Sequence, residues 1–246
     1  MENEQPKFPT EVIELPSRGK LYPKESPLAK GEIEVKYMTA KEEDILTNQN
    51  YIQKGIVIDK LLQSLIVDKN IKYGSLIAGD KNAILVAARV LGYGSEYEFE
   101  YNGVKETFDL STVDPKPLHS TIESAESNEF PFKLPSTGVT ITFKLMNGDD
   151  ETRVDKEIAG LKKIYKEGVP ELTTRLKHQI LSVDGESDAN VIREFVDNKL
   201  LAIDSRAFRK YVQEITPDVD LTFYPEDSSE GGVDIPIGIN FLYPDL

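Results

Sequence analysis

The same short segments occur twice in this chain and in the same order. Leu-Pro-Ser-Arg-Gly at 15–19 recurs as Leu-Pro-Ser-Thr-Gly at 134–138. Three identical pairs mark the stretch that follows: Lys36 with Lys144, Met38 with Met146, and Glu43 with Glu151. A period of about 110–120 residues is too long for the units of a solenoid and predicts two related domains. We therefore expect an internal duplication.

The correspondence continues toward the end of each half. "LLQSLIVD" at 61–68 aligns with "KHQILSVD" at 177–184, and 76–101 aligns with 200–225. The first half has an extra loop at 23–31, and the second has about eight extra residues after Asp184. The predicted organisation is an N-terminal arm (1–12), a first repeat (13–113), a polar linker (114–133) and a second repeat (134–246).

Each half has the pattern of an α+β domain. Apolar residues alternate at Ile33, Val35 and Tyr37, and again over 139–145, which is the period of a strand with one buried face. Thr39 and Glu42 form a capping-box pattern that predicts a helix start, and Asn147 holds the matching place. Core-facing stripes then predict a second helix in each half: Ile58, Leu61, Leu62, Leu65 and Ile66 in the first, and Leu172, Leu176 and Ile180 after Pro170 in the second.

A third helix and a hairpin complete each predicted half. Asp80 and Asp204 stand where a helix N-cap is expected, and the helices should end at Gly92 and before Pro217. Asn102-Gly103 predicts a tight turn within a hairpin at 97–110. A looser turn at Gly231-Gly232 predicts a second hairpin over 220–246. The fold class is therefore α+β, with each half running strand, helices, terminal β-hairpin.

The second pentapeptide, "LPSTG", also matches the signal by which sortases attach proteins to cell walls. Such a signal precedes an apolar segment and a basic tail, whereas here a predicted strand and about a hundred further residues follow. We expect no signal peptide, because the N-terminal residues contain no basic region followed by an apolar run. No apolar run approaches the length that spans a bilayer, so we expect no membrane partner.

Charge and composition exclude several kinds of site. A net charge of -14 opposes non-specific binding of nucleic acid, and Lys162, Lys163 and Lys166 are expected to form a solvated helix face. The chain has no cysteine and therefore no thiolate. His119 and His178 lack the spacing of paired metal ligands. The residues predict no metal site and no cofactor.

Catalytic motifs are also missing from the sequence. Acidic residues 42–44 fit the electrostatics of a helix start better than an acid–base pair. Asp80 and Asp204 are open to a catalytic or metal-binding role, but capping explains both positions together. "GYGSEY" at 92–97 lacks the third glycine of a dinucleotide fingerprint and precedes a strand. We predict no catalytic residue, no small-molecule substrate and no enzymatic activity.

An ordered set of segments resembles the baseplate hub subunit family of T4-like contractile-tailed phages. These segments are "LPSRGKLY", "GEIEVKYMTAKEEDILTN", "GIVIDKLLQSLIVD" and "LIAGDKNAILVAARVLGYGSEYEFEY" in the first half, and "ILSVDG", "AIDSRAFRKYVQEITPDVDL" and "IPIGINFLYP" in the second. The resemblance covers nearly the whole chain from about residue 13. Many members carry C-x-x-C pairs in the two hairpins, suggesting zinc-ribbon-like tips. Here the turns contain Asn102-Gly103 and Asp227-Ser228-Ser229, so no zinc is implied.

The resemblance implies a viral structural or assembly protein, in the virion tail baseplate or in the host cytoplasm during assembly. Its partners would be other hub and tail-tube proteins. Two surfaces are candidates for binding them: Arg18 and Tyr22 in the first loop, of residue types common at interface hot spots, and Phe241, Leu242 and Tyr243 near the C-terminus. Local packing of the loop, and a last core strand at the C-terminus, are the alternative interpretations.

Two other functions remain open at this point. A two-domain adaptor of a cellular host would act without any phage tail protein. A hydrolase using clustered carboxylates would have a deep pocket in which two carboxylates face each other, and would depend on Asp80 or Asp204.

Overall fold

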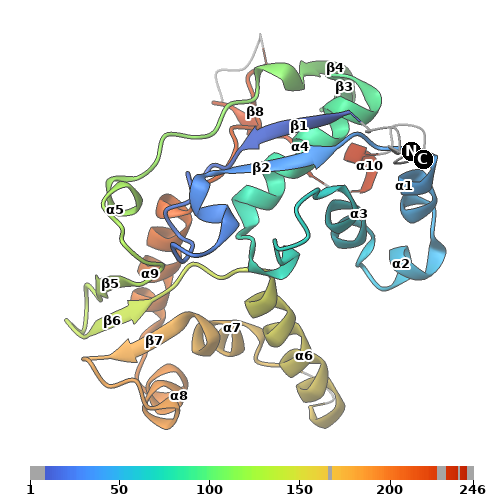
Figure 1. The fold of residues 1–246 in the computed structure, drawn as a ribbon. Coiled ribbons are helices and arrows are strands. Elements are labelled where there is room, and N and C mark those ends of the chain that lie inside the picture. The colour runs from blue at the N-terminus through green and yellow to red at the C-terminus, as the bar shows by residue number, and fades with distance from the viewer. Residues whose placement is uncertain (1–8, 166–167, 226–230, 238, 243–246) are drawn as a thin grey trace, which may run out of the picture.

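The computed structural model describes residues 9–165, 168–225, 231–237 and 239–242. It combines helices with several small antiparallel sheets, so the predicted α+β class is confirmed (Figure 1). The elements up to residue 113 are β1 (Thr10–Glu14), η1 (Pro27–Lys30), β2 (Glu32–Lys36), α1 (Ala40–Leu46), α2 (Gln49–Gln53), α3 (Val57–Leu65), η2 (Tyr73–Ser75), α4 (Ala78–Tyr93), β3 (Glu96–Tyr101), β4 (Val104–Asp109) and η3 (Leu110–Thr112).

The later elements continue the same mixture. They are α5 (Ser120–Glu123), β5 (Phe130–Lys133), β6 (Thr140–Phe143), α6 (Gly148–Ile164), α7 (Glu171–Gln179), β7 (Ile180–Val183), α8 (Ala189–Asn198), α9 (Ala202–Ile215), β8 (Thr222–Phe223), β9 (Val233–Asp234) and α10 (Ile239–Leu242). In the described part of the chain no helix is long and apolar enough to cross a membrane.

The strands around β2 and those around β6 have the same order. β6 lies between β5 and β7 in a three-stranded antiparallel sheet. β2 pairs with β1 on one edge, and an isolated bridge from Val35 to Ile66 occupies its other edge. In both places the chain returns to the central strand directly after a helix, α3 or α7. The internal duplication itself stays a prediction, which this shared order supports.

Each Leu-Pro-Ser-x-Gly segment begins the connection between two antiparallel strands, a connection that in the first half also contains η1. Leu15 N donates to Gly31 O over 2.8 Å, and Leu134 N donates to Val139 O over 2.9 Å. The alternating apolar residues predicted the strand after each turn, whereas the strand before it was not predicted. The arm predicted at 1–12 therefore overlaps β1, and the linker predicted at 114–133 contains α5 and β5.

The predicted linker is bound to the second half of the chain. Lys116 N donates to Asp218 O, and Asp220 N donates to Asp114 O, each over 2.8 Å. An isolated bridge joins Pro115 to Val219 between these bonds. Backbone groups of residues 114–116 are thus paired with the segment that follows α9.

Helix starts follow the predictions in two of four cases. Thr39 and Asn147 are the N-caps of α1 and α6, each with a capping box, as predicted. α4 and α9 begin earlier than expected, with N-caps Ile77 and Leu201. The prediction that Asp80 and Asp204 are N-caps is therefore wrong: both lie in the first helical turn, and their carboxylates bind more distant residues.

The predicted core stripes are confirmed on α3 and partly wrong on α7. Leu61, Leu62 and Leu65 are buried. On α7 Leu176 is buried, but Leu172 is 45% exposed. The buried face of α7 consists of Thr174, Leu176 and Gln179, and Ile180 belongs to β7. Leu172 is four residues before Leu176, but in the first turn of this short helix it lies beyond the core.

The two hairpins differ in regularity. Asn102 (φ 51°) and Gly103 (φ 80°) form the predicted turn between β3 and β4, with the positive φ pair typical of a type I′ turn. β8 and β9 pair over two residues each, and Gly231-Gly232, where the turn was predicted, directly precedes β9. Residues 226–230 of the connection lie outside the described residues. The chain then forms the short helix α10 where sequence analysis allowed a last core strand.

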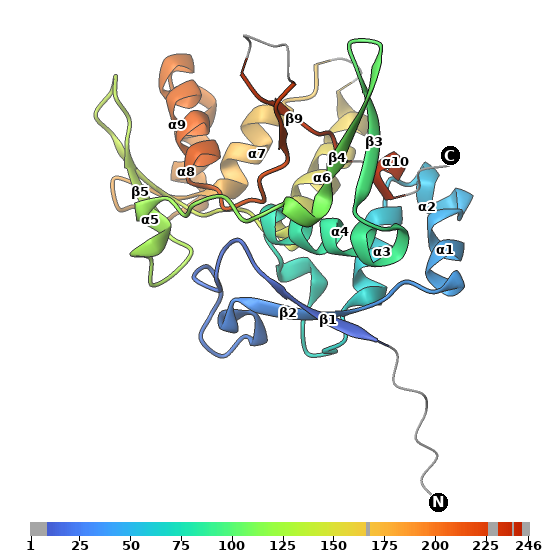
Figure 2. The ribbon, with the colours of Figure 1, turned by 90° about the horizontal axis from the view of Figure 1, so that it is seen from above.

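The two halves share one hydrophobic core. Phe223 of β8 meets Phe99 of β3 edge-on at 5.0 Å between ring centroids. Phe241 of α10 lies 4.9 Å from Tyr97, also of β3. Figure 2 shows α10 beside β3, far along the chain from it. The C-terminal segments therefore complete the core of the N-terminal half.

A close backbone approach between the halves occurs at Gly79, in the first turn of α4. A Cβ added there would lie 1.9 Å from Pro217 O and 2.8 Å from Asp218 Cα. Both neighbours are backbone, so neither moves aside easily.

We predict that Gly79→Ala destabilises the protein by about 1–3 kcal/mol, because the methyl group forces the two segments apart. Gly160→Ala on α6 is the matched control, since a Cβ at Gly160 meets nothing within 4 Å. That change should stabilise by about 0.5–1 kcal/mol through helix propensity alone. Urea unfolding measures both, and a stabilising Gly79→Ala would contradict this packing.

Candidate partner-binding site

The first loop is held by one buried carboxylate. Asp80 is fully buried and accepts Ser17 N at Oδ1 over 2.9 Å and Ser17 Oγ at Oδ2 over 2.7 Å. The Tyr22 hydroxyl also donates to Asp80 Oδ2 and accepts Ile77 N over 3.2 Å. One side chain of α4 thus fixes both ends of the turn that follows β1.

Burial dominates the ionisation of this cluster. It raises the pKa of Asp80 against the opposing effect of the hydrogen bonds from Tyr22 and Ser17. It also raises the pKa of the Tyr22 hydroxyl, and the neighbouring Asp80 charge acts in the same direction. The phenol therefore stays protonated and remains a hydrogen-bond donor to the carboxylate.

A second carboxylate holds the second loop in the same way. Asp204, also fully buried, accepts Ser136 N at Oδ1 over 2.8 Å. Its Oδ2 accepts Thr137 N over 3.1 Å and Thr137 Oγ1 over 2.9 Å. Burial opposes the ionisation of Asp204, but these hydrogen bonds together outweigh it and lower its pKa. Two backbone donors favour the charged form here, where Asp80 has one.

A further pair of contacts recurs where the central strands lead into helices. Lys36 Nζ lies 2.7 Å from Glu42 Oε1, and Lys144 Nζ lies 2.6 Å from Asp150 Oδ1. Burial works against the ionisation of Glu42, but Lys36 and Thr39 more than compensate and lower its pKa. Both acids occupy the third position of their helix and complete its capping box.

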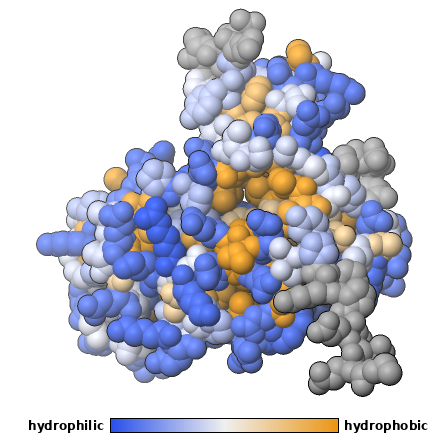
Figure 3. All heavy atoms as spheres, turned by 45° about the horizontal axis from the view of Figure 1, so that its top comes forward, coloured by the Kyte–Doolittle hydropathy of each residue, from blue (hydrophilic) through white to orange (hydrophobic). Residues whose placement is uncertain are grey.

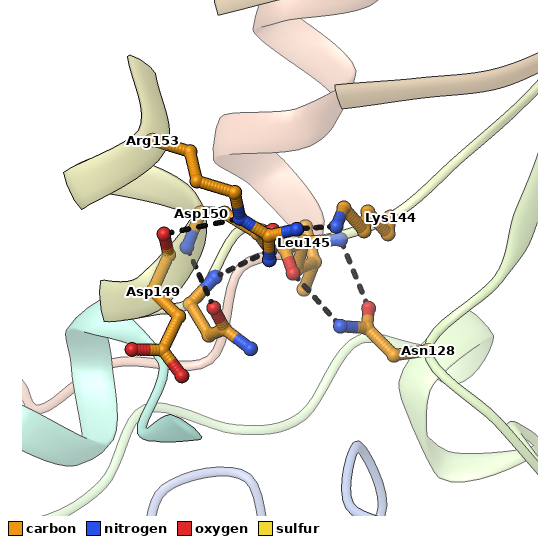
Figure 4. A network of polar contacts seen from close by, with 7 residues as sticks. Asn128, Lys144, Leu145, Asp149, Asp150 and Arg153 are labelled. Carbon is orange, nitrogen blue, oxygen red and sulfur yellow. Dashed lines mark hydrogen bonds and ion pairs between the residues drawn. The ribbon is translucent and has the colours of Figure 1, made fainter. Parts of the chain in front are cut away.

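The second copy of this contact is more elaborate. Arg153 Nη2 also binds Asp150 Oδ1, at 2.7 Å. Asn128 exchanges two hydrogen bonds with the backbone of Leu145, over 2.9 Å and 2.8 Å. Figure 4 shows Lys144 and Arg153 converging on Asp150 while Asn128 holds the neighbouring backbone. This network fixes the connection from β6 to α6.

The predicted binding residues lie in different environments. Arg18 is exposed at the turn, with a φ of 49°, and borders a hollow of about 380 Å³ with Glu14, Lys30 and Glu32. Tyr22 is only 8% exposed, and its hydroxyl is held by Asp80. Arg18 is therefore the part of the predicted loop surface that is available to a partner, and Tyr22 packs locally.

The predicted C-terminal surface is not exposed where the structure describes it. Phe241 is 1% exposed and Leu242 is fully buried, and α10 packs against α4. The expectation that these two side chains dock into a neighbour is corrected: within this chain they fill its own core. Tyr243 lies outside the described residues.

The histidines and aspartates considered for chemistry have structural contacts. His119 Nδ1 accepts Thr121 N over 3.2 Å and so caps α5, while His178 Nε2 lies 2.8 Å from Glu157 Oε2. Among the described residues no group of three or more His, Asp or Glu side chains is arranged to hold a metal ion. Lys162 pairs with Glu171 at 3.2 Å on the surface, and Lys166 lies outside the described residues.

Sequence reasoning missed the partners of the two aspartates. The signal was present, since each pentapeptide and its aspartate recur together in the two halves. Comparison with known proteins adds no relative: no family model, no curated protein and no solved structure matches this chain.

We predict that Asp80→Asn is tolerated better than Asp204→Asn. At position 80 the amide nitrogen would face two hydroxyls, from Ser17 and Tyr22, which can accept a hydrogen bond. The cost should be about 1 kcal/mol. At position 204 it would face the Thr137 N–H, so two donors oppose each other. Urea unfolding at neutral pH measures the order, and equal losses would contradict these roles.

The two substitutions should also differ in pH dependence. The raised pKa of Asp80 means that its stabilising contribution is complete below the unfolded pKa, about 3.9, and declines as pH rises through the folded value. The lowered pKa of Asp204 means that its contribution is present above about 3.9 and is lost as pH falls through the folded value. The stability difference between wild type and each variant, measured from about pH 3 to pH 8, should therefore have opposite slopes. Slopes of the same sign would refute the assignment.

Proposed function

We propose that this protein is a non-enzymatic component or assembly factor of a phage tail baseplate hub, acting by binding other hub and tail-tube proteins. One observation carries the proposal. The resemblance to hub subunits follows the order of the chain through both halves, and its segments coincide with the Leu-Pro-Ser-Arg-Gly turn, β2, α3, α4 and α9. A resemblance to one isolated motif would carry far less.

The contacts of the acidic residues favour binding over hydrolysis. Asp80 and Asp204, on which the hydrolase interpretation depends, are both fully buried. All four of their carboxylate oxygens accept hydrogen bonds from the two loops. Carboxylates engaged in this way position the backbone, and a general base instead has to reach a substrate.

Several exposed side chains are available to contact a partner protein. Arg18 lies on the surface with no ion pair or hydrogen bond from its side chain to another described residue. Leu201 and Ile203, at the start of α9, are 49% and 63% exposed. Arginine and large apolar side chains are the kinds of residue that contribute to interface cores.

The test is co-expression with the tail and hub proteins encoded near it in its source genome, followed by affinity purification. We expect at least one of these proteins to co-purify, and Arg18→Ala to reduce its yield severalfold. Arg193→Ala, a change at an exposed arginine on α8, is the matched control and should leave the yield unchanged. The proposal fails if no tail or hub protein co-purifies and virions form normally without this protein. A cellular partner in their place would favour the adaptor.

A further inference from the structure

One edge of β1 is open. Tyr37 N donates to Pro9 O and Leu15 N donates to Gly31 O, so odd-numbered residues of this strand direct their backbone groups toward β2. Because hydrogen bonding alternates along an antiparallel pair, Thr10, Val12 and Glu14 direct theirs to the opposite side. No other described segment forms a backbone hydrogen bond with that edge.

An apolar groove runs along this open edge. It has a volume of about 680 Å³ and lies between β1, α4 and residues 110–115. Its apolar wall includes Ala83, Val86, Ala87, Val90, Leu110 and Val113. Figure 3 shows apolar side chains gathered around a hollow on the side of the molecule where β1 lies. Val12, at the middle of the edge, is 57% exposed.

The β1–β2 sheet has an inner and an outer face that a third strand, added at the open edge of β1, could continue. Ile13 lies opposite buried Ile33 and belongs to the inner face, whereas Val12 lies opposite Glu34 on the outer face. A strand added beside β1 would continue these faces. Its inward side chains, at alternate positions, would enter the groove and meet α4.

The rim of the groove is acidic. Glu11, Glu14 and Asp114 line it, and no lysine, arginine or histidine of the described residues does. Their carboxylates form no hydrogen bond or ion pair with another described side chain. In a chain with a net charge of -14, this rim attracts a positively charged segment.

We propose that β1 binds an extended segment of a partner protein as an added strand, with apolar side chains at alternate positions and lysine or arginine at its ends. Main-chain hydrogen bonds to Thr10, Val12 and Glu14 would supply affinity, and the groove and its rim would supply specificity. This inference deepens the proposed function, on which it rests for the premise that the chain acts by binding.

A second copy of this chain fits the edge less well. Pairing of two β1 strands would place Glu11 and Glu14 of both copies on one shared edge, where like charges repel. A basic segment removes that repulsion and neutralises the rim.

The first experiment uses a fluorescein-labelled synthetic peptide of alternating valine and threonine with lysine at both ends. We expect a saturable rise in anisotropy, and binding at least about tenfold weaker when the lysines are replaced by glutamates. Hydrogen exchange of the full-length protein should slow at the amides of Thr10, Val12 and Glu14 when the peptide is added. Protection at another surface, or no binding, would overturn the proposal.

Two substitutions at position 12 distinguish the contribution of the backbone N–H to peptide binding from that of the side chain. Val12→Pro removes an edge N–H and should weaken peptide binding about tenfold, whereas Val12→Thr keeps the N–H and should bind within about twofold of wild type. Ala87→Phe fills the groove, leaves β1 unchanged and should also weaken binding, which covers the case that the proline variant does not fold. Equal binding by wild type, Val12→Pro and Ala87→Phe would refute the site.

The same variants separate this inference from the proposed function. If hub proteins co-purify with wild type and equally with Val12→Pro and Ala87→Phe, the proposed function stands and the strand site is wrong. If the peptide protects β1, but no tail or hub protein co-purifies and virions form normally without this protein, the hub assignment fails and the site stands. A dimer in light scattering that Val12→Pro abolishes would identify a second copy as the occupant and contradict the proposal.

Discussion

The hydrogen bonds between each Leu-Pro-Ser-x-Gly turn and a buried aspartate are the contacts on which the arrangement of this protein depends. In each half the turn begins the connection between two antiparallel strands, and the aspartate lies in the first turn of a later helix. A buried carboxylate without partners is costly, so it strongly favours the one backbone conformation that supplies its donors. The turn, the strands that it connects and the helix that carries the aspartate, α4 or α9, are thereby positioned together.

The aspartate–turn contact is present in both halves, but the pKa of the aspartate is shifted in opposite directions. Asp80 is shared with the hydroxyl of Tyr22, and burial governs its pKa. Asp204 is bound by two backbone N–H groups, which keep its pKa low despite burial. Similar local geometry therefore leaves one carboxylate easier to protonate than the other, although both hold a turn of the same sequence pattern.

Several features were predictable because they depend on neighbouring residues. Capping boxes at Thr39 and Asn147 and the Asn102-Gly103 turn involve groups within three positions, and the structure confirms them. β1 and β5 were missed because their residues do not present a clean apolar face: "TEVIE" carries two exposed glutamates, and "FPFK" contains a proline. The partners of Asp80 and Asp204 lie between 58 and 68 positions away, beyond any local pattern.

The sequence indicated which residue types could form a binding site, but it did not indicate which of them would be exposed. An aromatic residue with a hydroxyl, such as Tyr22, suits an interface as well as a buried polar cluster, and only the fold distinguishes these environments. The open edge of β1 required knowledge of its register with β2. The described surface includes an exposed arginine at a turn, a strand edge without a backbone partner among the described residues, and an apolar groove with an acidic rim.

The position of α10 has a consequence for synthesis of the chain. Phe241 and Leu242 pack with Tyr97 and α4, elements that leave the ribosome much earlier. A nascent chain that has emerged only through α9 still lacks these side chains, so its N-terminal half exposes apolar surface. Because domains generally fold as their residues become available, this half stays incomplete until residue 242 has emerged.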